Sequence, residues 1–240
     1  MTKPEILTKG RAEGLSNEVI DSFFDLFENT IDANNMRQGP DFPKRLHNCD
    51  EAGLATKPVS KKVFVLKKQK NAYLRAAGSG KSTYSVFFCI TANGDLCPPF
   101  VVYKAKYLNQ SWTNGGPPGA CYGVTKSGWM EDVVFQEWFL KHYVPWAEAF
   151  TKPCIPLLDG HGSHLTYQVV KAARENQIIM LCLPPHTSHA LQPCDVALFR
   201  PLKVAWKDVL KMWFRETRLQ VVDKSVFPSL LGNWAKDPPR

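Results

Sequence analysis

Three aspartates occupy positions from which a folded chain could gather metal-binding carboxylates. A short run at 45–49 predicts a strand ending in Asp50, the apolar run 155–158 predicts a strand ending in Asp159, and Asp195 directly precedes a helical pattern. Strand ends of α/β sheets are where ligand-binding residues gather. Three adjacent carboxylates cannot all stay ionised without cations, and their oxygens suit Mg²⁺ or Mn²⁺. Two such ions would support phosphoryl displacement.

On spacing alone, three ordinary surface or capping aspartates remain an alternative, because Asp195 is also placed like an N-cap residue.

The patterns around these acids predict a mixed α/β domain. Apolar residues recurring every three or four positions predict helices at 16–32, 129–150, 165–176 and 196–215. Strands are predicted at 45–50, 83–91, 100–103, 155–159 and 178–183, with a basic strand or hairpin at 57–70. A Gly-, Pro- and Asn-rich loop is predicted at 109–128, and a weakly structured tail at 216–240. Antiparallel strands followed by an α/β half predict a mixed sheet with helices on both faces.

The composition of the chain excludes several classes of protein. The chain has 240 residues, 44% of them apolar, which is enough to bury a sizeable core. A formal net charge of +8 favours a polyanionic partner. None of the seven cysteines forms a C-x-x-C pair, so we expect free thiols in a reducing compartment rather than a zinc finger. No window reaches the roughly 20 apolar residues of a membrane span, and the first thirty residues have no signal-peptide core, so we expect an intracellular protein with no membrane partner.

Each of the three acids stands in a longer motif: NCDEAGL at 48–54, LLDGHGSH at 157–164 and LPPHTSHALQPCDV at 183–196. Taken in order, these segments resemble the three acid-bearing motifs of the DDE superfamily endonuclease domain, which is found in pogo, Tigger and jerky-like transposases and in centromere protein B. The resemblance departs from the family at Ala52, where Thr or Ser is usual, and at Cys194, where Leu is more common. The resemblance covers roughly residues 44–215, which we expect to form the catalytic core. The sequence patterns predict an N-terminal helix and connector at 1–43 and a C-terminal tail at 216–240.

The resemblance implies an RNase H-like fold and metal-assisted cleavage of DNA phosphodiesters, followed by strand transfer. By position, Asp50 would bridge two Mg²⁺ or Mn²⁺ ions, while Asp159 and Asp195 would each hold one. The expected partners are DNA and, in a homodimer, a second copy of the chain, and the expected location is the nucleus. The N-terminal helix-turn-helix region of full transposases is missing, so the chain is expected to be a fragment, a truncated copy or a stand-alone core. The alternative is a catalytically idle, host-retained protein that binds DNA or chromatin.

Weaker signals surround these motifs. A lysine cluster could follow a DNA backbone or could belong to a solvated strand edge; its members are Lys57, Lys61, Lys62, Lys67, Lys68 and Lys70. Hydrogen-bonding support for the acids is expected from His161, His164, His189 and Gln192. The two H-x-x-H pairs, at 161–164 and 186–189, leave a zinc hydrolase open as a further alternative. The segment GSGKST at 78–83 resembles a phosphate-binding loop, but Arg75 stands where that motif needs Gly, so it is interpreted as a hairpin loop.

Overall fold

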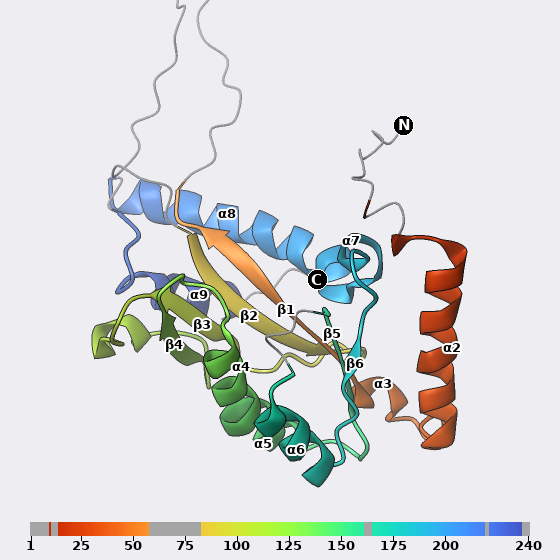
Figure 1. The fold of residues 1–240 in the computed structure, drawn as a ribbon. Coiled ribbons are helices and arrows are strands. Elements are labelled where there is room, and N and C mark those ends of the chain that lie inside the picture. The colour runs from red at the N-terminus through yellow and green to blue at the C-terminus, as the bar shows by residue number, and fades with distance from the viewer. Residues whose placement is uncertain (1–9, 11–13, 58–82, 161–164, 219–220, 237–240) are drawn as a thin grey trace, which may run out of the picture. The chain divides into compact units, whose positions relative to one another are not determined.

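The computed structural model describes residues 10, 14–57, 83–160, 165–218 and 221–236 (Figure 1). The basic segment predicted at 57–70, apart from Lys57, and the GSGKS part of the loop at 78–83 therefore lie outside the described residues. The chain forms two compact units. One unit contains residues 1–51, 87–99 and 130–199, and the other contains residues 52–86, 100–129 and 200–240.

Six strands form one mixed sheet in the order β4-β3-β2-β1-β5-β6. The strands are β1 (Leu46–Ala55), β2 (Thr83–Thr91), β3 (Phe100–Lys104), β4 (Cys121–Thr125), β5 (Ile155–Leu158) and β6 (Leu181–Cys182). Parallel pairs are formed by β1 with β5, by β5 with β6 and by β3 with β4. The mixed sheet predicted from the sequence is confirmed.

Among β1, β2 and β3, adjacent strands run antiparallel to one another. The Ala92 amide, just after β2, donates to the Leu46 carbonyl at the start of β1. At the other end, a Cβ built on Gly53 of β1 would lie 2.9 Å from Cγ2 of Thr83, the first residue of β2. Residue 90 of β2 in turn forms an antiparallel bridge with residue 96, which precedes β3.

Helices lie on both faces of β2, because successive strand residues point to opposite sides. The Phe87 ring contacts Phe135 and Trp138, with centroids 5.8 and 4.7 Å apart, whereas the Phe88 ring lies 6.0 Å from Phe199. Phe135 and Trp138 belong to α4 (Asp132–Trp138), and Phe199 begins α8 (Phe199–Glu216). The predicted placement of helices on both faces therefore holds at this strand.

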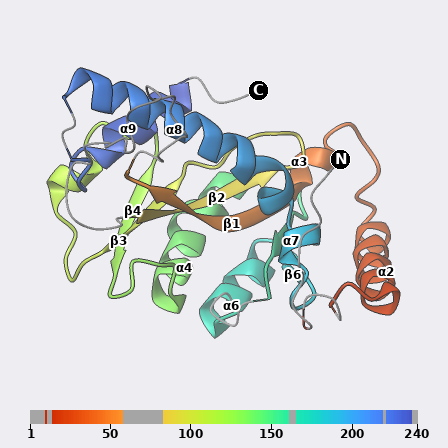
Figure 2. The same ribbon diagram turned by 90° about the horizontal axis from the view of Figure 1, so that it is seen from above.

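The remaining helices of the first unit surround the parallel strands. The predicted helix at 129–150 is formed by α4, a π-helical turn (Phe139–Tyr143) and α5 (Val144–Ala147). Figures 1 and 2 show α6 (Tyr167–Glu175) beside α4. Beyond them, α2 (Asn17–Ala33) packs through Ile31 into a core cluster that includes Ile155 of β5 and Leu181 of β6. Short helices, α3 (Phe42–Arg45) and α7 (Ser188–Leu191), lead into β1 and toward the third acid.

Three sequence predictions need correction. The first strand does not end at Asp50, because β1 continues five residues further, to Ala55. The predicted loop at 109–128 contains a 3₁₀ turn (Gln110–Thr113) and β4, which pairs with β3 over five residues. Parallel pairing is a non-local property, so composition rich in turn residues concealed this strand.

The third correction concerns the predicted weakly structured tail. Residues 227–236 form α9 (Phe227–Lys236), whose buried side chains recur at helical spacing: Phe227, Leu230, Leu231 and Trp234. The Phe227 ring packs against Tyr84 and Trp206, with centroids 4.8 and 5.3 Å apart. Pro228 falls in the first turn of α9, where proline is tolerated.

Candidate functional site

The three acids come from three different elements of the first unit. Asp50 lies within β1 and is partly buried, Asp159 follows the last residue of β5, and Asp195 lies in a π-helical turn (Cys194–Leu198) that leads into α8. The parallel register pairs Asn48 with Leu157. Extended by two residues, the same register places Asp50 of β1 level with Asp159, which directly follows β5.

The carboxylate of Asp50 lies within electrostatic range of the other two acids. Burial, and then the negative charges of Asp195 and Asp159, raise the pKa of Asp50 from 3.8 to about 7. Hydrogen bonds from the Glu51 amide, 2.7 Å from Asp50 Oδ1, and from the Gln192 side chain act in the opposite direction and lower that pKa. The structure thus gathers negative charge at one place without supplying enough donors to compensate it.

This donor set fits a hard divalent cation. Its oxygen atoms are the ligand type that Mg²⁺ and Mn²⁺ prefer, and a cation would relieve the repulsion that raises the pKa of Asp50. Among the residues that the structure describes, no three carboxylate, imidazole or thiol groups stand together as a completed ligand shell. The carboxylates therefore interact through their charges without yet being close enough to share an ion, and a bound ion would have to draw them closer.

A buried amide connects the segments that carry the acids. Asn48 is 4% exposed, and its Nδ2 donates to the Leu157 carbonyl at 3.0 Å and to Oε1 of Gln192 at 2.6 Å. Its Oδ1 accepts a hydrogen bond of 2.8 Å from the Cys194 amide. One side chain thus joins β1, β5 and the π-helical turn.

The position of Asn48 explains why this connection matters for the acids. Asn48 lies two residues before Asp50 on the same strand, so both side chains face the same side of the sheet. The carbonyl that it reaches on β5 lies two residues before Asp159, and the amide that it reaches on the turn directly precedes Asp195. Sequence reasoning did not single out Asn48. The available signal was a polar amide two residues before an acid on the same predicted strand.

The structure describes two of the four residues that were predicted to support the acids by hydrogen bonding. Gln192 is fully buried, and its Nε2 donates to the Cys49 carbonyl at 3.3 Å, so its expected role beside Asp50 has a structural basis. His189 lies in α7, and within the described residues its buried Nε2 has no hydrogen-bond partner. His161 and His164 lie outside the described residues, so the convergence that a zinc site needs stays a hypothesis.

Other predicted or neighbouring groups do not join the acids. Of the six predicted DNA-binding lysines, Lys57 is described and partly buried, whereas Lys61, Lys62, Lys67, Lys68 and Lys70 lie outside the described residues. Glu51 alternates with Asp50 along β1, and its carboxylate accepts from the Met130 amide at 3.1 and 3.3 Å. That contact assigns Glu51 to holding Met130, two residues before α4.

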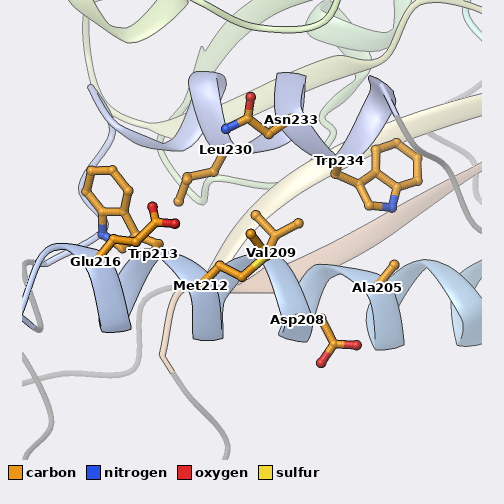
Figure 3. A pocket seen from close by; sticks show the side chains of 9 residues that line it. All are labelled: Ala205, Asp208, Val209, Met212, Trp213, Glu216, Leu230, Asn233 and Trp234. Atoms are coloured by element: carbon orange, nitrogen blue, oxygen red, sulfur yellow. The ribbon is translucent and has the colours of Figure 1, made fainter.

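The second unit contains a hollow of about 500 Å³ between α8 and α9 (Figure 3). Its wall combines apolar side chains, Met212, Trp213, Leu230 and Trp234 among them, with the carboxylates of Asp208 and Glu216. None of the predicted site residues lines it.

The order of strands and the placement of the acids define the class of protein. A mixed sheet with antiparallel β1 to β3 and a parallel β5 beside β1, carrying acids on β1, after β5 and before a long helix, is an RNase H-like fold. The structure is similar to that of a Mos1 transposase paired-end complex with left transposon end, with a TM-score of 0.56 and 13% sequence identity over 98% of this chain and 63% of that one. A Mos1 mariner paired end complex with Mn is also similar, with a TM-score of 0.56 and 14% identity over 98% of this chain and 64% of that one.

The chain belongs to the DDE superfamily endonuclease family, because the family model matches residues 81–231, more than half of its length. That match includes Asp159 and Asp195, whereas Asp50 precedes it. The family resemblance inferred from the sequence is thereby confirmed.

Curated relatives are much longer than this chain. The human protein named Pogo transposable element with KRAB domain is 22% identical over 206 residues, which cover 85% of this chain and 32% of that protein. A protein of Cochliobolus lunatus named MFS-type transporter clz9 is 28% identical over 165 residues, which cover 67% of this chain and 18% of that protein. The chain thus spans about a third or less of these relatives. In the described part of the chain, no helix combines the length and apolarity needed to span a membrane.

Proposed function

We propose that this domain is a divalent-metal-dependent DNA endonuclease core in which Asp50, Asp159 and Asp195 hold Mg²⁺ or Mn²⁺. The observation that carries the proposal is the β1–β5 register, which, extended by two residues, places Asp50 level with Asp159. The family match over residues 81–231, which includes Asp159 and Asp195, supports it independently. The raised pKa of Asp50, caused first by burial and then by the charges of the other two carboxylates, agrees with it.

Each carboxylate would have a distinct task. Asp50 interacts with both other acids, so it is suited to bridge two ions, while Asp159 and Asp195 would each hold one. When bound, a pair of such ions supplies charge stabilisation for the attacking and leaving oxygens of a phosphodiester. Gln192 and the Glu51 amide would orient Asp50, and Asn48 would keep the three segments in register.

The proposed substrate and location follow from the same reasoning. Similar structures include a transposase bound to a transposon end, and the net charge of +8 favours a polyanion. We therefore propose DNA as the partner and the nucleus as the place of action. A homodimer stays a prediction that the oligomeric state in solution would test.

A nicking assay distinguishes an active nuclease from an idle remnant. Supercoiled plasmid would be incubated with Mg²⁺ or Mn²⁺ and three proteins: the unmodified chain, Asp159→Asn and Asp25→Asn. Asp25 is exposed on α2, so its variant makes the same chemical change away from the proposed ligands. The proposal predicts metal-dependent nicking that Asp159→Asn abolishes and Asp25→Asn retains. Equal behaviour of all three folded proteins would instead support the catalytically idle, DNA- or chromatin-binding alternative.

A further inference from the structure

A stripe of positive charge runs along α8. All the basic residues of this helix are exposed, and they recur at intervals of three or four positions: Arg200, Lys203, Lys207, Lys211 and Arg215. At about 100° of rotation per residue, the five fall within an arc of roughly 120° on the helix surface. The two acids of the helix, Asp208 and Glu216, fall outside that arc. We call these five residues the α8 stripe.

The rest of the unit holds the α8 stripe in a fixed position. An adjoining face of the helix is buried through Leu202, Trp206, Leu210 and Phe214. The indole of Trp206 also donates a 2.7 Å hydrogen bond to the Ala55 carbonyl at the end of β1. Because its apolar face is used inside the protein, α8 is not available as a membrane-inserting amphipathic helix.

The positive charges of the α8 stripe repel one another. Lys203, Lys207, Lys211 and Arg215 follow at successive intervals of four, and like charges at that spacing destabilise a helix. Lys211 forms an ion pair with Asp208. The helix carries five cations against two acids, so a polyanion that follows the stripe would reduce the repulsion between neighbouring cations.

We propose that the α8 stripe binds the phosphate backbone of double-stranded DNA, an inference that rests on the proposed DNA-cleaving function. The stripe extends over about 22 Å at 1.5 Å per residue. Duplex DNA carries one charge per roughly 1.7 Å of its axis, so about a dozen phosphates lie along that length. Regularly spaced basic side chains on a rigid helix suit contacts that position a duplex without reading its sequence. The stripe also differs from the lysine cluster predicted at 57–70.

The test measures how binding depends on salt. Fluorescence anisotropy would give the affinity of the full chain for a duplex of about 30 base pairs, in EDTA, between about 50 and 200 mM KCl. The test variant neutralises three stripe residues as Lys203→Gln, Lys207→Gln and Lys211→Gln. A matched control neutralises three exposed lysines elsewhere, Lys126, Lys141 and Lys171, so both variants lose the same net charge. Circular dichroism and melting temperature verify that both are folded.

Each phosphate contact contributes about 0.9 to the slope of log affinity against log salt. The proposal predicts that the stripe variant lowers the magnitude of that slope by roughly two to three, while the control changes it by less than about one. Equal slopes for the two variants would overturn the proposal, and so would absence of duplex binding by the unmodified chain. Preference for polyglutamate over the duplex would also overturn it, in favour of an acidic protein partner. Because EDTA removes the metal, these outcomes are independent of nicking. A reduced slope without metal-dependent nicking would reject the nuclease and keep the DNA-binding surface.

Discussion

Removing the Asn48 side chain tests whether one buried amide organises the proposed metal site. Asn48→Ala would eliminate hydrogen bonds of 2.6, 2.8 and 3.0 Å that reach Gln192, Cys194 and Leu157. At a net value of about 1 kcal/mol each, the loss amounts to roughly 3 kcal/mol of unfolding free energy, with an additional cost because buried partner atoms lose their donor or acceptor. Urea denaturation of the metal-free protein measures this change.

The same variant should lose metal affinity beyond what its lower stability explains. A suitable comparison is Phe227→Ala, which empties a core position in the other unit and should cost about 3–5 kcal/mol. Titration calorimetry with Mn²⁺, at a temperature where both variants remain folded, should show weaker binding for Asn48→Ala only. Asn109→Ala, an exposed amide that bonds Ser111, should change neither stability nor binding substantially.

Two results would refute this reasoning about Asn48. A loss of stability under about 0.5 kcal/mol would mean that the three hydrogen bonds contribute little net energy. Equal Mn²⁺ affinity in Asn48→Ala and Phe227→Ala would mean that the amide stabilises the fold without positioning the acids.

Three further predictions concern titrating groups. Because burial and two carboxylates raise the pKa of Asp50 from 3.8 to about 7, its ionised form destabilises the metal-free fold increasingly as pH rises between those values, by at most about 4 kcal/mol. Asp50→Asn should therefore be more stable than the unmodified protein in urea at about pH 8, and lower stability would contradict this. Mn²⁺ should raise the melting temperature more at about pH 8 than at pH 5.5, since binding at the lower pH must first displace the proton on Asp50; a shift independent of pH would exclude Asp50 as a ligand. Burial lowers the pKa of His47 from 6.5 to about 4, so the unfolded chain binds a proton on this imidazole more readily than the folded chain does. About 3 kcal/mol of unfolding free energy should therefore be lost as pH falls from 6.5 to about 4. His47→Gln should flatten that dependence in denaturation curves, and an unchanged slope would contradict the assignment.

Much of the candidate site was predictable because short motifs carry its chemistry. Asp159 and Asp195 stand in long, specific segments, and Asp159 does follow a strand as its apolar run predicts. The strand at 83–91 and the long helix after Asp195 also matched, because strong local periodicity and burial agree there. Local pattern therefore predicted a mixed α/β sheet, and the family resemblance added the RNase H-like fold and the choice of the three acids, which stays a prediction.

The tertiary structure determined those elements that depend on contacts between segments distant in the sequence. The strand β1 continues past Asp50 through Glu51, Ala52 and Gly53, residues without a strong strand preference. Likewise, β4 exists through its pairing with β3, and α9 through the packing of Phe227 against aromatic residues far away in sequence.

The role of Asn48 could not come from sequence either. Its partners lie 109, 144 and 146 positions away along the chain, and only folding brings them within hydrogen-bonding distance. The sequence determined which carboxylates could hold a metal, because residue type and motif are local properties. The tertiary structure decided which of them are neighbours and what holds them there, because burial and hydrogen bonding depend on contacts between distant segments.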